Sequence, residues 1–162
     1  MQNKLQRSIV VNSMNALKFV AMQMKQVALE TINELNKNTL IEHLGIEVIE
    51  LGADYIVGRM PVDQRTIQPF GLLHGGASVV LIESLGSIGS SLLINHDEEF
   101  SVGLEVNANH VGAAKEGFVV ATAKLSHGGR RTHVWVVEVH HEASKRLICT
   151  GRLTVMVVDK KR

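Results

Sequence analysis

The chain has 162 residues, of which 45% are hydrophobic and 20% charged, and its formal net charge is +1. This length and composition indicate a single globular domain with a core of its own. The near-neutral charge provides no basic field of the kind that nucleic acid or a membrane surface attracts, so neither partner is expected.

Residues 1–29 carry lysine and arginine but no acidic residue, and their apolar side chains recur at alternating steps of four and three. This pattern predicts a basic, amphipathic helix. Two interpretations stay open: a targeting segment similar in charge to a mitochondrial transit peptide, and a dispensable extension upstream of a natural start at Met24. Because the segment carries no candidate chemistry, residues 30–162 are expected to form the functional domain.

The next elements are a helix and a hairpin. Residues 30–43 continue in a helical pattern, and Gly45 supplies a stop signal. Residues 45–52 and 55–63 then alternate apolar with polar side chains. The turn residues Gly52-Ala53-Asp54 lie between them, so the two runs are predicted to pair as an antiparallel hairpin.

A long, almost wholly apolar helix is predicted to begin near Gly75, and it is followed by strand-like runs at 101–111, 117–127, 131–141 and 146–158. The connections are too short for parallel pairing, which needs a dozen or more residues. A helix that is apolar on nearly all faces has to be covered on all of them. The expected fold is therefore α+β, with a curled antiparallel sheet wrapped around one long central helix.

The loop before this helix reads QPFGLLHGG over residues 68–76. Its proline and glycines allow a sharp turn and close backbone approach, which brings Gln68 and His74 beside the first free amides of the helix. Such amides, with the positive end of the helix dipole, suit a carbonyl oxygen that becomes an oxyanion. The motif is equally compatible with a tight helix entry at Gly75-Gly76 and a merely structural His74.

Glu83 is the one carboxylate within the apolar run from 77 to 94, and it makes this run unsuitable as a membrane span. An unpaired carboxylate is costly to bury, and buried carboxylates of this kind are typical of catalytic bases. A solvated or ion-paired helix position is the alternative. Ser87 lies one turn later on the same face, where it either orients Glu83 or contacts substrate, or bonds back to its own helix.

Gly75 and Glu83 are 83 − 75 = 8 positions apart, which places them roughly 12 Å apart along a helix. A glutamate side chain does not span that distance. If both groups act on one carbonyl, they come from two copies of the chain, packed as a two-fold dimer with antiparallel helices.

Other motifs are weaker. The turn from Gly128 to Arg131, with two glycines and two arginines, suits a phosphate but equally a hairpin with solvated arginines. The eight histidines lack metal-ligand spacing, so neither a metal nor another cofactor is expected. The run from Gly76 to Val80 lacks the final glycine of a nucleophile elbow, which argues against a serine hydrolase. Cys149 is the only cysteine, which excludes a disulfide within the chain and favours a soluble, cytoplasmic protein.

Three stretches together resemble a known family: QPFGLLHGGASVVLIESLGS at 68–87, GLEVNANHV at 103–111 and HGGRRTHVW at 127–135. They are similar, in order and spacing, to the hotdog-fold acyl-CoA thioesterases of the phenylacetic-acid-degradation type. The likeness runs from about Thr39 to Val158. It is strongest to the subgroup with 1,4-dihydroxy-2-naphthoyl-CoA hydrolase of menaquinone synthesis and the proofreading thioesterase of enterobactin synthesis.

The resemblance implies a hotdog fold and a homotetramer of dimers, with acyl-CoA sites at the dimer interface. It also implies roles: Glu83 as catalytic carboxylate, Gln68 placing water or substrate, His74 and the Gly75 amide at the thioester carbonyl, Ser87 and Phe70 in the acyl pocket, and His110, Arg130 and Arg131 toward the CoA arm. The chain departs from its relatives at Gly112, where a basic residue is common, and at Arg130, where a small polar residue is common.

The predicted activity is hydrolysis of an aryl or related acyl-CoA thioester to the free acid and CoA. A thioester needs a nucleophile and an oxyanion acceptor but hardly any acid for its leaving thiolate, so one carboxylate suffices. The alternative is a non-catalytic acyl-CoA sensor, for which a carboxylate beside an oxyanion site has no use. A hydratase or dehydratase would need an aspartate and histidine pair that the motifs lack.

Overall fold

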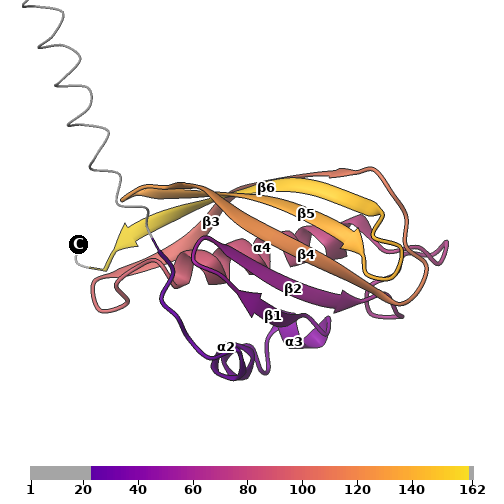
Figure 1. The fold of residues 1–162 in the computed structure, drawn as a ribbon, viewed down its shortest axis with the longest axis horizontal. Coiled ribbons are helices and arrows are strands. Elements are labelled where there is room, and N and C mark those ends of the chain that lie inside the picture. Colours follow the sequence, from indigo (N-terminus) through magenta and orange to yellow (C-terminus); the bar gives the residue numbers. More distant parts are fainter. Residues whose placement is uncertain (1–22, 161–162) are drawn as a thin grey trace, which may run out of the picture.

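The computed structural model describes residues 23–160, which form one antiparallel sheet and three helices (Figure 1). In chain order the elements are α2 (Leu29–Leu35), α3 (Leu40–His43), β1 (Glu47–Leu51), β2 (Tyr55–Pro61), α4 (Gly75–Ser91), β3 (Glu99–His110), β4 (Phe118–Gly128), β5 (Thr132–His141) and β6 (Leu147–Asp159). None of these helices is long and apolar enough to cross a bilayer.

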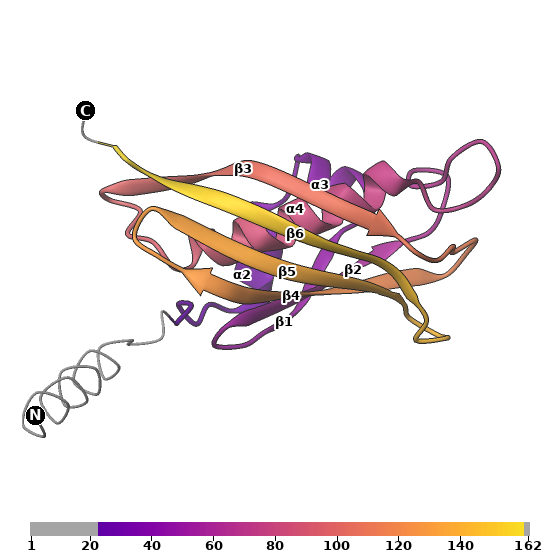
Figure 2. The same ribbon diagram turned by 90° about the horizontal axis from the view of Figure 1, so that it is seen from above.

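The sheet has the strand order β1-β2-β4-β5-β6-β3, and every neighbouring pair is antiparallel. It curls over α4, which runs beneath one face, while α2 and α3 lie below β1 and β2 (Figures 1 and 2). This confirms the expected α+β architecture, and the hairpin and the four later strands form close to their predicted positions.

The second predicted helix is broken in two. Thr39 is the N-cap of the second piece, α3, because its hydroxyl accepts a hydrogen bond from the Ile41 amide at 3.2 Å. Asn38, just before it, has a φ of 60°, a left-handed conformation that asparagine tolerates well. The periodicity of residues 30–43 therefore predicted helix correctly at both ends, and the asparagines between them form the turn.

Residues 23–28, just before α2, form no regular helix. Met24, expected on the apolar stripe of an N-terminal helix, is 3% exposed and belongs to the core. Its amide donates to Ala53 O at 3.0 Å, and the Lys25 amide and Nζ donate to Leu92 O and Ile94 O, at 3.0 and 2.7 Å. These residues thus pack on the domain and close the C-terminal end of α4. The helix predicted for residues 1–22 lies outside the described residues.

The core lies between α4 and the inward-facing side chains of the strands. Trp135 of β5 is wholly buried, and its indole nitrogen donates to Ser90 Oγ of α4 at 2.8 Å. A Cβ at Gly86 or Gly89 would come within 3.3 or 2.6 Å of the indole ring. Glycine at these two positions lets the Trp135 ring pack on the helix backbone, which sets the distance between α4 and the sheet.

The two edges of the sheet differ. The Asn33 side chain exchanges two hydrogen bonds of 2.9 Å with the backbone of Val48, so α2 pairs with one residue at the outer edge of β1. At the other edge, β3 pairs with β6 alone among the described residues. A twelve-residue strand with one free edge is a ready surface for another chain.

His133 is a buried polar residue in β5. Its side chain is 0% exposed, and neither ring nitrogen has a hydrogen-bond partner within residues 23–160. Burial lowers the pKa of His133 below its ordinary value of 6.5, and the nearby His127 adds to this, while Glu99 and the backbone of Gly129 act in the opposite direction. His133 is therefore neutral in the folded protein.

This depressed pKa makes the folded state sensitive to acid. The unfolded chain takes up a proton at His133 first, so stability is full above about pH 6.5 and falls as the pH drops toward the folded-state pKa. In urea titrations at fixed protein concentration, the free energy of unfolding should fall less steeply between pH 7.5 and 5 for His133→Leu than for the wild type. Parallel pH profiles for the two proteins would contradict this assignment.

Candidate functional site

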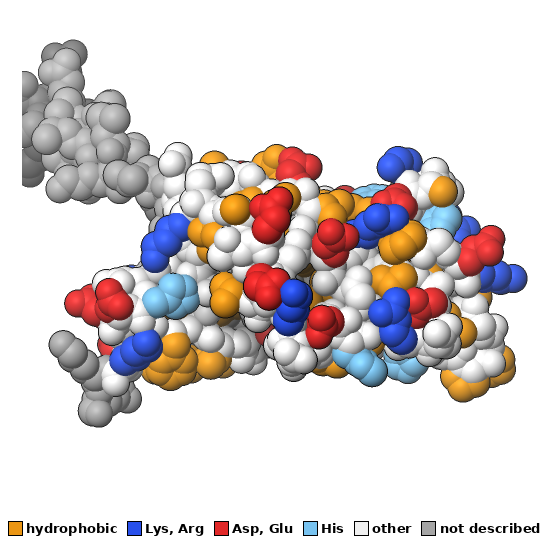
Figure 3. All heavy atoms as spheres, turned by 90° about the horizontal axis from the view of Figure 1, so that it is seen from below, with side chains coloured by type: hydrophobic (Ala, Val, Ile, Leu, Met, Phe, Trp, Pro, Cys, Tyr) orange, Lys and Arg blue, Asp and Glu red, His pale blue; other side chains and the backbone are white. Residues whose placement is uncertain are grey.

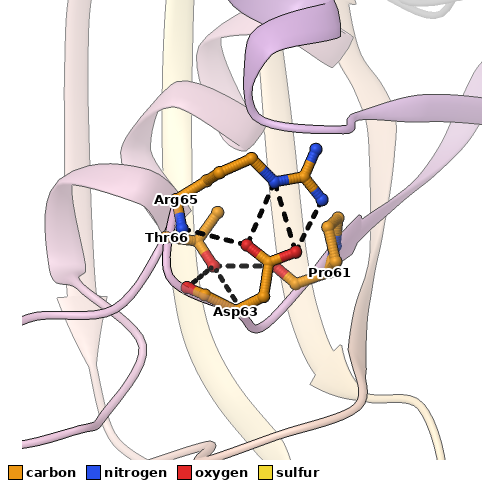
Figure 4. A network of polar contacts seen from close by, with 4 residues as sticks. All are labelled: Pro61, Asp63, Arg65 and Thr66. Atoms are coloured by element: carbon orange, nitrogen blue, oxygen red, sulfur yellow. Dashed lines mark hydrogen bonds and ion pairs between the residues drawn. The ribbon is translucent and has the colours of Figure 1, made fainter.

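The loop that precedes α4 is held at its start by a small polar network (Figure 4). Thr66, 1% exposed, donates from its hydroxyl to Pro61 O at 2.8 Å and accepts from the Asp63 amide at 3.1 Å. Arg65 forms an ion pair of 2.6 Å with Asp63, and its side-chain and backbone hydrogen bonds lower the pKa of the Asp63 carboxyl. This network fixes the direction in which the loop leaves β2.

The rest of the loop folds back toward the helix. The backbone of Gln68 makes two hydrogen bonds of 2.8 Å: its N–H donates to Leu72 O, and its C=O accepts from the Gly71 N–H. Gly71 has a φ of +75°, which favours glycine. The Gln68 side-chain oxygen accepts from the Phe70 amide at 2.5 Å, so its NH₂ group is left to donate. Phe70, at the tip, is 89% exposed.

His74 is the N-cap of α4. Its Nδ1 accepts a hydrogen bond of 2.8 Å from the Gly76 amide. A ring nitrogen that accepts carries no proton, so neutral His74 holds its proton on Nε2 and can donate there. The His74 backbone amide donates to Thr66 O at 2.8 Å, which ties the cap to the polar network.

The Gly75 amide is the only one of the first four helix N–H groups that remains free. Gly76 N–H donates to the His74 ring, and the Ala77 and Ser78 amides donate to His74 O at 3.0 and 3.3 Å. Gly75 N–H has no acceptor among residues 23–160. This amide lies at the positive end of the helix dipole, so the helix offers one preorganised donor to a developing negative charge.

The His110 ring lies against Gly75. It is the last residue of β3, and a Cβ built on Gly75 would be 2.8 Å from its Nε2. A side chain at position 75 would therefore displace the imidazole. The sequence placed His110 only through family resemblance, whereas the structure brings it to the helix start beside His74 and Gly75.

Glu83 lies on the half-buried side of α4, opposite its buried neighbours Leu81, Ile82 and Leu85. Its Oε1 accepts a hydrogen bond of 3.1 Å from Ser87 Oγ. The same oxygen occupies the space that a Cβ on Gly103 of β3 would need. Ser87 thus orients the carboxylate, and Gly103 is a glycine whose importance the sequence did not reveal.

The two parts of the site do not meet within one copy of the chain. The Glu83 carboxylate is fixed beside Ser87 and Gly103, roughly 12 Å along the helix from Gly75. The arginines lie farther still, because the turn between β4 and β5 is at the C-terminal end of α4 (Figure 1). There Arg131 forms an ion pair of 3.4 Å with Asp159.

Within residues 23–160 no three His, Cys, Asp or Glu side chains come together in a way that could hold a metal ion. The groups that the described residues bring to the site are a carboxylate, two imidazoles, an amide side chain and a backbone amide without an acceptor.

Comparison with known proteins places this geometry in context. The family model described as "Thioesterase superfamily" matches residues 70–148. The 1,4-dihydroxy-2-naphthoyl-CoA hydrolase of Escherichia coli is 45% identical over 134 residues, which cover 83% of this chain and 97% of that protein. The proofreading thioesterase EntH of Cronobacter turicensis is 42% identical over 134 residues, 83% of this chain and 96% of its own.

A solved structure agrees with these relatives. A thioesterase from Pseudomonas aeruginosa, crystallised as a glutamine-to-alanine variant, superposes with a TM-score of 0.83 at 43% identity. The match covers 86% of this chain and 99% of that one.

The capping role of His74 can be separated from any other role. His74→Ala removes the acceptor for Gly76 N–H and should lower the free energy of unfolding by about 0.5–2 kcal/mol, the usual cost of losing an N-cap. His74→Asn keeps a good capping acceptor and should retain most of that stability. Urea titrations of both variants test this, and equal losses would show that the ring packs rather than caps.

Proposed function

We propose a substrate for a chain that belongs to the thioesterase superfamily, has the hotdog fold and is a thioester hydrolase. The proposed reaction is hydrolysis of an aryl or related acyl-CoA thioester to the free acid and CoA. The observation that carries this proposal is the free Gly75 amide at a helix start where the other three N–H groups are satisfied. The relatives' names favour an enzyme over the non-catalytic sensor.

In the proposed mechanism the thioester carbonyl oxygen accepts hydrogen bonds from Gly75 N–H and from His74 Nε2–H. Both donors are fixed before substrate arrives, so they stabilise the oxyanion without reorganising. The Gln68 NH₂ group donates to the substrate or to the attacking water, and Phe70 covers the acyl group from the loop tip.

Glu83 supplies the nucleophile in one of two ways. As a base it takes a proton from water, and the hydroxide adds to the carbonyl carbon. As a nucleophile it adds to that carbon itself, and water then cleaves the resulting anhydride. In both routes the tetrahedral intermediate collapses and the sulfur leaves as thiolate, which is easy for a thiol of pKa about 8.5.

The separation of Gly75 and Glu83 requires the carboxylate to come from a second copy. Glu83 lies against Gly103 of β3, and β3 is the strand with a free edge. A two-fold partner added at that edge would extend the sheet and place its own α4 antiparallel to this one. The proposed unit is therefore a dimer with two composite sites, and a tetramer is two such dimers.

The proposal also covers the acyl group of the substrate and the cellular compartment of the enzyme. The E. coli relative's name makes 1,4-dihydroxy-2-naphthoyl-CoA the first substrate to test, and with it a step of menaquinone biosynthesis. The single, free Cys149 fits a reducing compartment, so we assign the enzyme to the cytoplasm.

Loss of the carboxylate should abolish most of the activity. Glu83→Gln keeps the size of the side chain but neither accepts a proton nor attacks, so kcat should fall by at least ~10²–10⁴ with little change in KM. Steady-state assays with naphthoyl-CoA and benzoyl-CoA measure this. Glu98→Gln, which alters an exposed carboxylate outside the site, is the control. Activity of Glu83→Gln within threefold of wild type would remove Glu83 from the mechanism.

The shared site can be tested by mixing subunits. A dimer of one Glu83→Gln chain and one His74→Asn chain has one intact site and one doubly defective site. Random co-refolding should therefore restore about a quarter of wild-type activity from two inactive parents. As a control, the double variant refolded alone under the same conditions should stay inactive. If the mixed preparation stays as inactive as its parents, each site is built from one chain.

A further inference from the structure

One glycine of β3 lies against the proposed catalytic carboxylate. A Cβ built on Gly103 would overlap Glu83 Oε1 and come within 3.1 Å of Cδ and 3.3 Å of Oε2. The whole carboxylate group therefore rests on the backbone of Gly103, with no room for a methyl group between them. Unlike Gly71, Gly103 does not have a positive φ, so its backbone conformation does not by itself require glycine. The contact with Glu83 is what excludes a side chain at this position.

The two oxygens of the Glu83 carboxylate have different surroundings. Oε1 accepts the hydrogen bond from Ser87 Oγ and is the atom closest to Gly103. Oε2 accepts no hydrogen bond from residues 23–160, and no ion pair reaches either oxygen from that part of the chain. Figure 3, which views the molecule from the side of α2 and α3, shows Lys and Arg side chains mixed with Asp and Glu. Ser87 and Gly103 therefore set the direction of the carboxylate and leave Oε2 to water or substrate.

A β-bulge is the reason why Gly103 faces the helix. Gly103 and His110 are 110 − 103 = 7 positions apart on β3, and on a regular strand an odd separation puts two residues on opposite faces. Their partners on β6, Val155 and Cys149, are only 155 − 149 = 6 positions apart, and both are buried. The register shift between Gly103 and Glu105 supplies the extra residue.

The bulge lets one strand contact both halves of the site. It turns Gly103 toward the Glu83 carboxylate. It also turns His110 toward Gly75, so both contacts lie on the face of β3 that covers α4. Bulges bend a strand and re-aim its side chains, and they are frequent beside active sites. The geometry of β3 thus serves the position of the carboxylate as well as the pairing of the sheet.

We infer that Gly103 is a positioning residue, whose bare backbone supports the Glu83 carboxylate so that Oε2 meets the thioester or the attacking water. The inference rests on the proposed function, because it assumes that Glu83 acts on the thioester. A side chain at position 103 would displace the carboxylate, while Gln68, His74 and Gly75 still bind the substrate. Since a displacement of about 1 Å can cost on the order of 10²-fold in rate, the loss should appear in kcat rather than in KM.

The test is a double-mutant cycle between positions 103 and 83, assayed with the faster of naphthoyl-CoA and benzoyl-CoA. Gly103→Ala should lower kcat at least tenfold and leave KM within twofold of wild type. In the Glu83→Asp background the side chain is one methylene shorter and does not reach the new methyl group. Gly103→Ala should therefore change kcat less than threefold in that background. Urea titration and gel filtration should show that Gly103→Ala folds and associates as the wild type does.

Gly58→Ala is the matched control. A Cβ on Gly58 would lie 2.6 Å from Leu85 Cδ2, so this substitution also crowds α4, but against an apolar side chain. It should lower the free energy of unfolding. Its effect on kcat should be the same in the wild-type and Glu83→Asp backgrounds, because Leu85 takes no part in the reaction.

Two results would overturn the inference. One is a Gly103→Ala enzyme whose kcat stays within twofold of wild type. The other is an equal loss of kcat in both backgrounds, which would show that Gly103 serves the fold or the association of subunits. The proposed function fails in a different way. An inactive Glu83→Gln with a fully active Gly103→Ala contradicts the inference alone, whereas an active Glu83→Gln contradicts both.

Discussion

The way in which α4 begins is the constraint on which the rest of the site depends. One residue, His74, satisfies three of the first four helix amides through its ring and its carbonyl oxygen, and only Gly75 N–H has no acceptor within residues 23–160. Gly75 is partly exposed, so water can accept from this amide until a ligand replaces it. The Thr66 network fixes the start of the loop that leads to His74, and in the proposed mechanism it thereby helps to aim the Gly75 donor before substrate arrives.

The rigidity of the same helix leads to a shared site. Gly75 and Glu83 are held on one rod, and no side-chain rotation shortens the roughly 12 Å between them. The structure presents Glu83 beside Gly103, next to a twelve-residue strand with a free edge, so the half-site and the surface for a second copy lie on the same side. In the proposed two-fold dimer, each α4 contributes to both sites: its Gly75 amide to one and its Glu83 carboxylate to the other.

The sequence predicted most of the fold because its hydrophobic periods are clear. Alternating side chains marked the strands within one or two residues, and the apolar run after Gly75 marked the central helix. It failed where packing overrides a local pattern. Met24 fits a helical stripe, yet the chain there is not helical and the side chain fills the core. The break between α2 and α3 depends on a cap at Thr39 that periodicity does not register.

By itself the sequence determined the α+β architecture and the candidate groups Gln68, His74, Gly75 and Glu83, and it predicted that a site shared by Gly75 and Glu83 would need two copies, since each follows from local pattern or from the fixed rise of a helix. Only the tertiary structure decided which amide has no acceptor among the described residues, that His110 lies on Gly75, and that Ser87 orients Glu83. These are contacts between segments far apart in the chain. Their distances depend on how the sheet closes over the helix, and no local spacing in the sequence encodes that closure.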